Sequence, residues 1–446
     1  MAKDMTSGKP IKLIWNFTIP LLIGNLFQQL YNMADTFIVG RTIGVHALAS
    51  VGSTGSIIFL ILGFANGLTA GLAIPLAQRY GAKNYSGVKR SFYVSILISA
   101  VVAILLTILS MIFCRQILEI MQTPVEIIDG AYDYLMVIFA GIFSSMAFNL
   151  LSNIFRSIGD AKTPLYFLVI ACIMNIILDV VFIAGFGMGV EGAGYATVLS
   201  QIFSALACIL YIWKKIPILR LNSKDFVAKS LDVKEHIRIS FPMAFQSSII
   251  AIGAIIIQIT LNQLGATAVA AYTAAQKIDQ VAILPMMSFG VTMATFVAQN
   301  YGAKKYDRIW RGVRDCIKLS LTFAISVGII LNLFSPIFIR AFVGVGHEEV
   351  VELGAIYFIT NGTMYSLLSL LFIYRYTLQG VGKTFTPTVA GIMELCMRAF
   401  AAVVLSNLYG YTGATMANPL AWLGSLIPLM IAYYLFKNKF PKEQVS

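Results

Sequence analysis

The stretch Gln78-Arg79-Tyr80-Gly81-Ala82-Lys83-Asn84-Tyr85 recurs 221 positions later as Gln299-Asn300-Tyr301-Gly302-Ala303-Lys304-Lys305-Tyr306. With a gap of one residue, the same shift places Pro20 on Pro242. A similarity that extends from Pro20 to Tyr85 at nearly the same shift indicates that the chain contains two copies of one structural unit. We expect the function of the protein to arise between the two copies.

The composition is that of a membrane protein. Of the 446 residues, 58% are hydrophobic and 12% are charged, and the mean hydropathy is +0.82. These values lie far from those of soluble domains. An apolar helix needs about 20 residues to cross a bilayer, and such stretches recur along the whole chain. We count twelve, six in each copy, beginning near residues 12, 46, 90, 130, 163, 192, 238, 266, 315, 352, 386 and 413.

Positive charges gather on one side of this arrangement. All but six of the 32 Lys and Arg residues fall on the side of the two termini. Cytoplasmic loops carry such an excess, so both termini and the central loop are predicted to be cytoplasmic. The net charge of +12 fits a surface beside anionic lipid and needs no nucleic-acid partner. The six exceptions are Arg41, Arg115 and Arg340 outside, and Lys277, Arg375 and Arg398 within spans.

An even number of spans in each copy returns the chain to the side on which that copy began. The two copies therefore share one orientation, and we predict a pseudo-two-fold axis along the membrane normal. The predicted fold is an all-α integral membrane protein with twelve transmembrane helices in two six-helix lobes. The first lobe is predicted at 1–213, a basic cytoplasmic linker at 214–236 and the second lobe at 237–446. The duplicated loops are interpreted as cytoplasmic turns that mark this topology.

Cysteine and histidine residues give no sign of a metal site or a disulfide framework. The five Cys residues lack CxxC spacing and are interpreted as small apolar fillers. The three His residues are isolated from one another, which argues against zinc. We also find no cluster of nucleophile, metal ligands or carboxylates near an interface, so an integral membrane enzyme is not predicted.

Acidic residues within spans need an explanation, because each costs at least ~2.5 kcal/mol to insert. In the second copy, bases lie close to the acids in the sequence. Glu394 and Arg398 are four residues apart, the favourable order for a pair within one helix. Lys277 and Asp279 share one turn of span 8, and Arg375 lies on span 10. We predict a structural ion-pair network made by these residues.

The first copy differs, because its two acids have no base within the membrane. Asp35 lies on span 1 and Asp179 on span 5, while Arg156 lies only at the cytoplasmic end of span 4. Two such acids must either stay protonated or bind a mobile cation. Both outcomes describe an exchangeable cation site. At the 221 shift, Asp35 falls on Ile256 and Asp179 on Phe400 or a close neighbour, so the second copy does not repeat them.

Polar side chains accompany these two acids on spans 1, 4, 5 and 6. Oxygen ligands of this kind suit Na⁺ or a proton relay better than a transition metal. The alternative is that they only join helix to helix, which explains amides and hydroxyls but not two uncompensated carboxylates. Asn175 and Thr197 complete the candidate cation site, and the supporting polar network consists of Gln28, Tyr31, Asn32, Asn149, Asn153 and Gln201.

In these residues the chain resembles the multidrug and toxic compound extrusion (MATE) family of cation antiporters. The resemblance covers essentially the whole chain as two lobes of six helices. The segments that carry it are Met33-Ala34-Asp35-Thr36, Gly159-Asp160 with Thr163-Pro164, Asn175-Ile176-Ile177-Leu178-Asp179 and Gly192-Ala193.

The resemblance implies export of organic cations in exchange for inward H⁺ or Na⁺, by alternating access of the two lobes. It assigns the coupling cation, including any Na⁺, to Asp35, Asn175, Asp179 and Thr197. Some members instead carry acids on helices 7 and 10 of the second lobe, where this chain has Gln258 in the middle of span 7. We expect no cofactor beyond the coupling ion, a monomer, and the plasma membrane of a prokaryote.

An apolar cavity rich in Met and aromatic residues would explain broad specificity. The candidate lining is Met33, Met286, Met287, Phe289 and Tyr365, although such residues in spans commonly face lipid or the core. The rival function is a flippase for lipid-linked oligosaccharides, from the wider superfamily. Such a protein would line its cavity with several Arg or Lys residues to hold pyrophosphate, and here the intramembrane bases lie beside acids.

Overall fold

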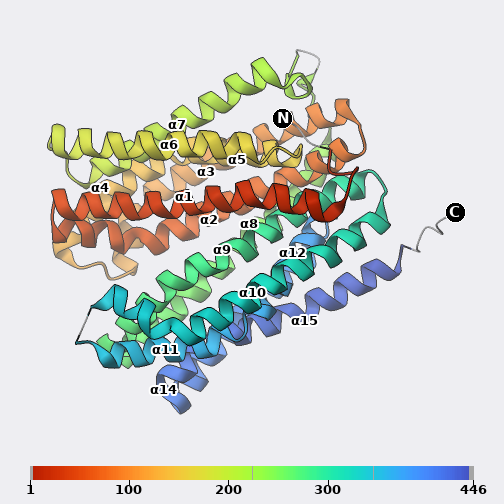
Figure 1. The fold of residues 1–446 in the computed structure, drawn as a ribbon. Coiled ribbons are helices and arrows are strands. Elements are labelled where there is room, and N and C mark those ends of the chain that lie inside the picture. The colour runs from red at the N-terminus through yellow and green to blue at the C-terminus, as the bar shows by residue number, and fades with distance from the viewer. Residues whose placement is uncertain (1–3, 223–224, 345, 441–446) are drawn as a thin grey trace. The chain divides into compact units, whose positions relative to one another are not determined.

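The computed structural model describes residues 4–222, 225–344 and 346–440, and within these residues it contains helices and turns but no strand (Figure 1). Residues 223–224 of the predicted linker lie outside the described part. Ten helical segments are long and apolar enough to cross a membrane, and two bent helix pairs bring the number up to twelve. The all-α membrane fold with twelve spans is therefore confirmed.

The first six spans follow the order predicted from hydropathy. The fourth span is bent by 48° between its two helices, and the fifth continues from an α-helix into a π-helical segment, η1. The elements are α1 (Pro10–Thr42), α2 (Val45–Gly81), α3 (Tyr85–Ile120), α4 (Val125–Ala140), α5 (Ile142–Ser157), α6 (Lys162–Asp179), η1 (Val180–Gly185) and α7 (Val190–Lys215).

The last six spans repeat this pattern after the short 3₁₀ helix η2 (Pro217–Leu219). The fourth span of this set is again a bent pair, with an angle of 46°, and the fifth again contains a π-helical segment, η4. The elements are α8 (Ser230–Leu264), α9 (Ala266–Gly302), α10 (Tyr306–Val343), α11 (Glu348–Gly362), α12 (Tyr365–Gly380), α13 (Phe385–Phe400), η4 (Ala401–Leu405), α14 (Ser406–Thr415) and α15 (Ala417–Asn438).

The chain forms two compact units, and two helices are shared between them. Met1–Asp4 and Ile19–Ala244 make the first unit, and Met5–Thr18 and Phe245–Ser446 make the second. We call these the first and second lobes. The beginning of α1 thus packs with the second lobe and the beginning of α8 with the first. In this respect the division differs from a simple cut at the predicted linker, 214–236.

The duplicated loops adopt one backbone conformation. In the first copy, the amide of Asn84 donates to the carbonyl of Arg79 (3.0 Å) and that of Lys83 to the carbonyl of Tyr80 (3.0 Å). The second copy repeats both bonds 221 residues later. These are the two bonds of a Schellman motif, which ends a helix with one residue in the left-handed region. That residue is Lys83 (φ 56°) in one copy and Lys304 (φ 59°) in the other.

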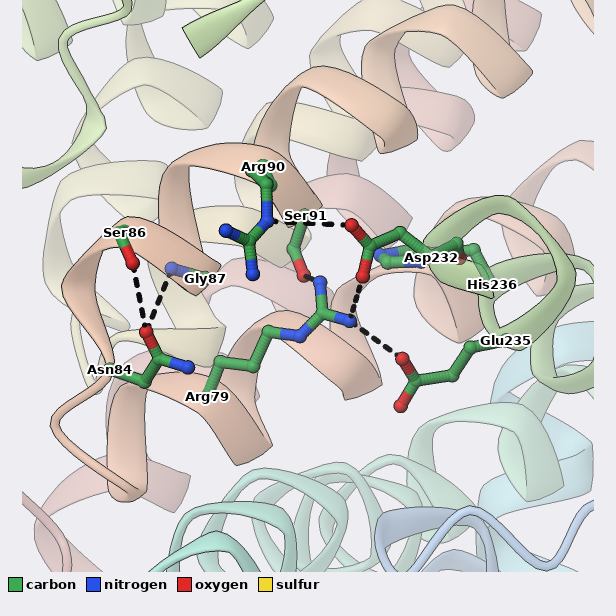
Figure 2. Close-up of polar contacts among 9 residues, drawn as sticks. All are labelled: Arg79, Asn84, Ser86, Gly87, Arg90, Ser91, Asp232, Glu235 and His236. Atoms are coloured by element: carbon green, nitrogen blue, oxygen red, sulfur yellow. Dashed lines mark hydrogen bonds and ion pairs between the residues drawn. The ribbon is translucent and has the colours of Figure 1, made fainter. Parts of the chain in front are cut away.

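In the first lobe, this loop and its flanking helices hold the beginning of α8 (Figure 2). One guanidinium nitrogen of Arg79 lies 2.7 Å from a carboxylate oxygen of Asp232 and 2.7 Å from one of Glu235. Arg90 adds a third ion pair, with Asp232 at 3.4 Å. Further along α8, a Cβ added at Gly71 would clash with the backbone of Ser240, so α2 and α8 are in close contact.

In the second lobe, the duplicated loop holds the segment before α1 in the corresponding way. The amide of Met5 donates to Gln299 Oε1 (2.9 Å), and Asn300 Nδ2 donates to the Met5 carbonyl (3.1 Å). The guanidinium of Arg308 donates to the Met5, Ser7 and Gly8 carbonyls. The duplicated loops are therefore anchors for the first helix of each copy, a role beyond that of topology markers.

We expect Arg79→Asn, which introduces the residue found in the second copy, to loosen the beginning of α8. Hydrogen bonds between charged groups contribute about 1.5–3 kcal/mol, so amide exchange over residues 230–240 should accelerate about 10- to 100-fold. Hydrogen exchange followed by mass spectrometry measures this directly. The matched control is Lys83→Asn, an exposed base of the same loop. Equal exchange in both variants would contradict the anchoring role of Arg79.

Candidate functional site

The position of Asp179 is fixed by an irregularity that both copies share. Asp179 is the last residue of α6, and the π-helical segment η1 begins at the next residue. In the second copy, η4 begins directly after Phe400, which lies 221 residues after Asp179. Such π-helical segments are frequent at functional sites. The backbone feature is thus duplicated, whereas the acid belongs to the first lobe alone.

The four predicted cation-site residues come together in the first lobe, from α1, α6 and α7. Asn175 Nδ2 donates to Thr197 Oγ1 at 3.3 Å, and the hydroxyl of Tyr31 lies 3.0 Å from the same Thr197 oxygen. The carboxyl groups of Asp35 and Asp179 are close enough to interact electrostatically with each other. Residues separated by more than 160 positions in the sequence therefore form one polar cluster.

This cluster presents oxygen atoms that have no donor. Asp179 is fully buried and Asp35 is 8% exposed. Among the described residues, neither acid has an ion pair with Lys or Arg, and no donor reaches Asp35 Oδ1, Asn175 Oδ1 or either carboxylate oxygen of Asp179. Two adjacent carboxylates in such a place need a shared proton or a bound cation.

Apolar side chains close one side of the cluster. Val39 lies one turn beyond Asp35 on α1, and Ile183 one turn beyond Asp179 in η1. They belong to a buried apolar layer on the predicted outer side of the acids. Tyr134 of α4 is part of this layer and lies close to both carboxyl groups. Tyr134 could not be predicted from the sequence, because a tyrosine on an otherwise apolar span looks like a packing residue.

A polar cavity of about 90 Å³ lies on the other side, toward the predicted cytoplasmic end of the lobe. Four of the six supporting residues line it, together with Ser152, whose buried hydroxyl has no partner in the described structure. Arg156 lies at this cavity as well. A polar cavity of this size can hold several water molecules. The four supporting residues are Gln28, Tyr31, Asn149 and Gln201.

The other two members of the predicted polar network have different positions. Asn32 is exposed, and its amide reaches only Gln29 on its own helix (3.5 Å). Asn153 Nδ2 donates to Thr69 Oγ1 (3.3 Å), so it joins α5 to α2. Their helical spacing predicted positions near the cluster, but a shift of a few residues along a helix turns a side chain away from it. Asn32 therefore lies on the helix surface, and Asn153 lies in a contact between two helices.

The five predicted substrate-cavity residues do not line the polar cavity of the first lobe. Met33 is 60% exposed, Met287 is half-buried, and Met286, Phe289 and Tyr365 are buried. The hydroxyl of Tyr365 is hydrogen-bonded to Asp279. Met286, Phe289 and Tyr365 are therefore packed between helices and are not accessible to a substrate in this structure. This agrees with the alternative that such residues belong to the core.

The predicted ion-pair network of the second lobe forms in part. Glu394 forms ion pairs with Arg375 at 2.6 Å and with Arg398 at 3.6 Å, and all three side chains are buried. The expected pair of Lys277 with Asp279 is wrong: Lys277 is exposed, and Asp279 is bonded to two tyrosines. The reason is helix geometry, since residues two positions apart point to different faces.

No transition-metal site accompanies these clusters. Within 4–222, 225–344 and 346–440, no three His, Cys, Asp or Glu side chains come together as ligands. The fold and the site together define a class of protein: a two-lobe, multi-pass helical membrane protein with a buried polar site in its first lobe.

Comparison with known proteins gives the family. The MatE family model matches residues 20–181 and 242–404, one match in each copy and together most of the chain. This chain belongs to the MatE family of membrane transporters. The two matches begin at Pro20 and Pro242, the prolines that the sequence repeat aligns.

Individual relatives are similar to this chain over almost its whole length. The probable multidrug resistance protein YoeA of Bacillus subtilis is 28% identical, covering 99% of this chain and 97% of the relative. The multidrug export protein MepA of Staphylococcus aureus is 24% identical, covering 96% and 94%. A solved structure described as MATE in complex with MaL6 has a TM-score of 0.88 at 24% identity, covering 98% and 97%, so the two proteins share the fold.

Proposed function

We propose that this protein exports organic, preferentially cationic, compounds in exchange for H⁺ or Na⁺ that moves inward. The names of the relatives support drug export over the flippase alternative. The observation that carries the ion coupling is the buried pair Asp35 and Asp179: among the described residues, three of their four carboxylate oxygens have no donor and neither acid pairs with Lys or Arg. Such a pair is costly unless it exchanges a cation.

The surroundings of the acid pair suggest a direction for the ion. The apolar layer with Val39 and Ile183 separates the pair from the predicted outer side, while the polar cavity extends toward the cytoplasmic side. We infer that this conformation is the one from which a bound cation leaves inward through water in the cavity. Entry from outside then requires the apolar layer to part.

Alternating access follows if the loaded and empty acid pair favour different lobe arrangements. A bound cation neutralises Asp35 and Asp179 and lowers the affinity of the first lobe for a cationic drug. Each inward charge gains about 2.3 kcal/mol per 100 mV of membrane potential. Moving a monovalent drug cation outward against the same potential costs an equal amount, so the potential drives export when two such charges enter for each drug cation.

The test is efflux of a fluorescent organic cation from vesicles, with a pH gradient and a Na⁺ gradient imposed separately. We expect one of the two gradients to drive efflux, and removal of that gradient with an ionophore to stop it. Transport that responds to neither gradient would reject the proposal. Vesicles with the Asp35→Asn/Asp179→Asn protein provide the background rate.

A further inference from the structure

Asp279 in the second lobe is a buried acid that does not pair with Lys277, the base expected from the sequence. It is 4% exposed and accepts hydrogen bonds from Tyr357 (2.9 Å) and from Tyr365. No Lys or Arg among the described residues pairs with it. Lys277 is exposed. The buried residues Arg375 and Arg398 both form ion pairs with Glu394.

The remaining groups around Asp279 are neutral or already paired. From its own helix, the Tyr272 ring packs edge-on against Tyr357 at 5.1 Å, and its hydroxyl is 3.4 Å from Asn418 Nδ2 of α15. Tyr357 comes from α11 and Tyr365 from α12. Arg398 of α13 interacts electrostatically with Tyr272, and its ion pair is with Glu394.

We propose that Asp279 is a second proton-binding site, which takes up and releases H⁺ during the transport cycle. This inference rests on the proposed function, because only a transporter coupled to ions would use the site. A carboxylate held only by neutral donors in a buried place bears a cost that a proton removes. The H⁺ comes from water, forms an O–H bond on the carboxylate, and returns to water on release.

The geometry favours a proton over Na⁺. Both carboxylate oxygens already accept a phenol O–H, so the tyrosines present hydrogens to Asp279 and not lone pairs. A hard metal cation would need several oxygen lone pairs in the same place. The first-lobe cluster is the opposite case, since among the described residues no donor reaches Asp35 Oδ1, Asn175 Oδ1 or the two carboxylate oxygens of Asp179.

Protonation of Asp279 would also act on the bent span. Tyr357 lies before the break between α11 and α12, and Tyr365 is the first residue after it. The ionised carboxylate therefore ties both halves of the span to α9. A protonated oxygen is a donor and a poorer acceptor, so H⁺ uptake releases one of the two tyrosines. The site thus links a proton to the angle at this break.

Infrared difference spectroscopy of the purified full-length transporter between acid and alkaline buffer tests the inference. A protonated carboxylic acid has a carbonyl stretch that the carboxylate lacks. We expect wild-type protein to show this band in acid, and Asp279→Asn to lose one component of it. Asp225→Asn is the matched control. Asp225 is half-buried beside Lys89, and the backbone amide of Asn222 and then Lys89 lower its pKa, so its removal should leave the band unchanged.

Two further variants separate the possible results. Tyr357→Phe removes one hydrogen bond to Asp279 and should shift the frequency of the same component, which keeps the test open if Asp279→Asn does not fold. Asp35→Asn/Asp179→Asn should lose a different component. A spectrum that neither Asp279→Asn nor Tyr357→Phe changes would overturn the inference. Loss of the Asp279 component with no change in the first-lobe double variant would instead count against the proposed coupling site.

Discussion

Asp179→Asn is expected to fold and to bind drug but to lose the ability to build a drug gradient. The amide keeps the shape of the side chain and removes the charge that holds the cation. An inward charge contributes about 2.3 kcal/mol at 100 mV, and 1.36 kcal/mol corresponds to tenfold. The loss of one coupled charge therefore lowers the drug gradient about 50-fold. Efflux from energised cells that lack other pumps measures this effect.

Asp35→Asn should behave in the same way, because both acids belong to one cluster. The matched control is Asp129→Asn, an exposed acid of the same lobe that pairs with Arg115; it should keep the wild-type gradient. Resistance and ion-dependent efflux at wild-type level in both Asp35→Asn and Asp179→Asn would show that the coupling site lies elsewhere.

Glu394→Gln is expected to have the largest effect on stability. Among the described residues, Glu394 is the one acid that pairs with the buried Arg375 and Arg398, at 2.6 and 3.6 Å. Removing one partner of a buried ion pair costs about 3–5 kcal/mol, because the remaining charge stays buried without compensation. We expect a much lower midpoint of thermal unfolding in detergent, and little protein in the membrane.

The matched control for this prediction is Arg340→Gln in the same lobe. Arg340 pairs with Glu348 at 2.6 Å, but both side chains are more than half exposed. Exposed pairs contribute about 0–1 kcal/mol, so the unfolding midpoint should barely move. Equal losses in Glu394→Gln and Arg340→Gln would contradict the view that burial makes the Glu394 network important.

The helices and the repeat were predictable because a bilayer imposes one requirement on every span. Backbone groups in hydrocarbon must be satisfied within the helix, so length and hydropathy reveal the spans. The acid pair was predictable for a related reason. Asp35 and Asp179 stand out in apolar spans without a base, and the structure brings them together.

Side-chain direction was the part that the sequence could not supply. Lys277 and Asp279 are close in sequence but lie on different helix faces, so Asp279 bonds instead to Tyr357 and Tyr365 from other helices. Tyr134 joins the first-lobe site through packing alone. Contacts of this kind depend on how helices pack, and periodicity within one helix does not determine that.

Coupling at Asp35 and Asp179 can be measured directly as the release of ions when drug binds. Saturating organic cation is added to purified transporter in weak buffer, and released H⁺ and displaced Na⁺ are counted. We predict that wild-type protein releases H⁺ or Na⁺ and that Asp35→Asn/Asp179→Asn binds the drug without releasing either from the first-lobe site. Drug binding with the same ion release in wild type and double variant would show that Asp35 and Asp179 do not couple ion to drug.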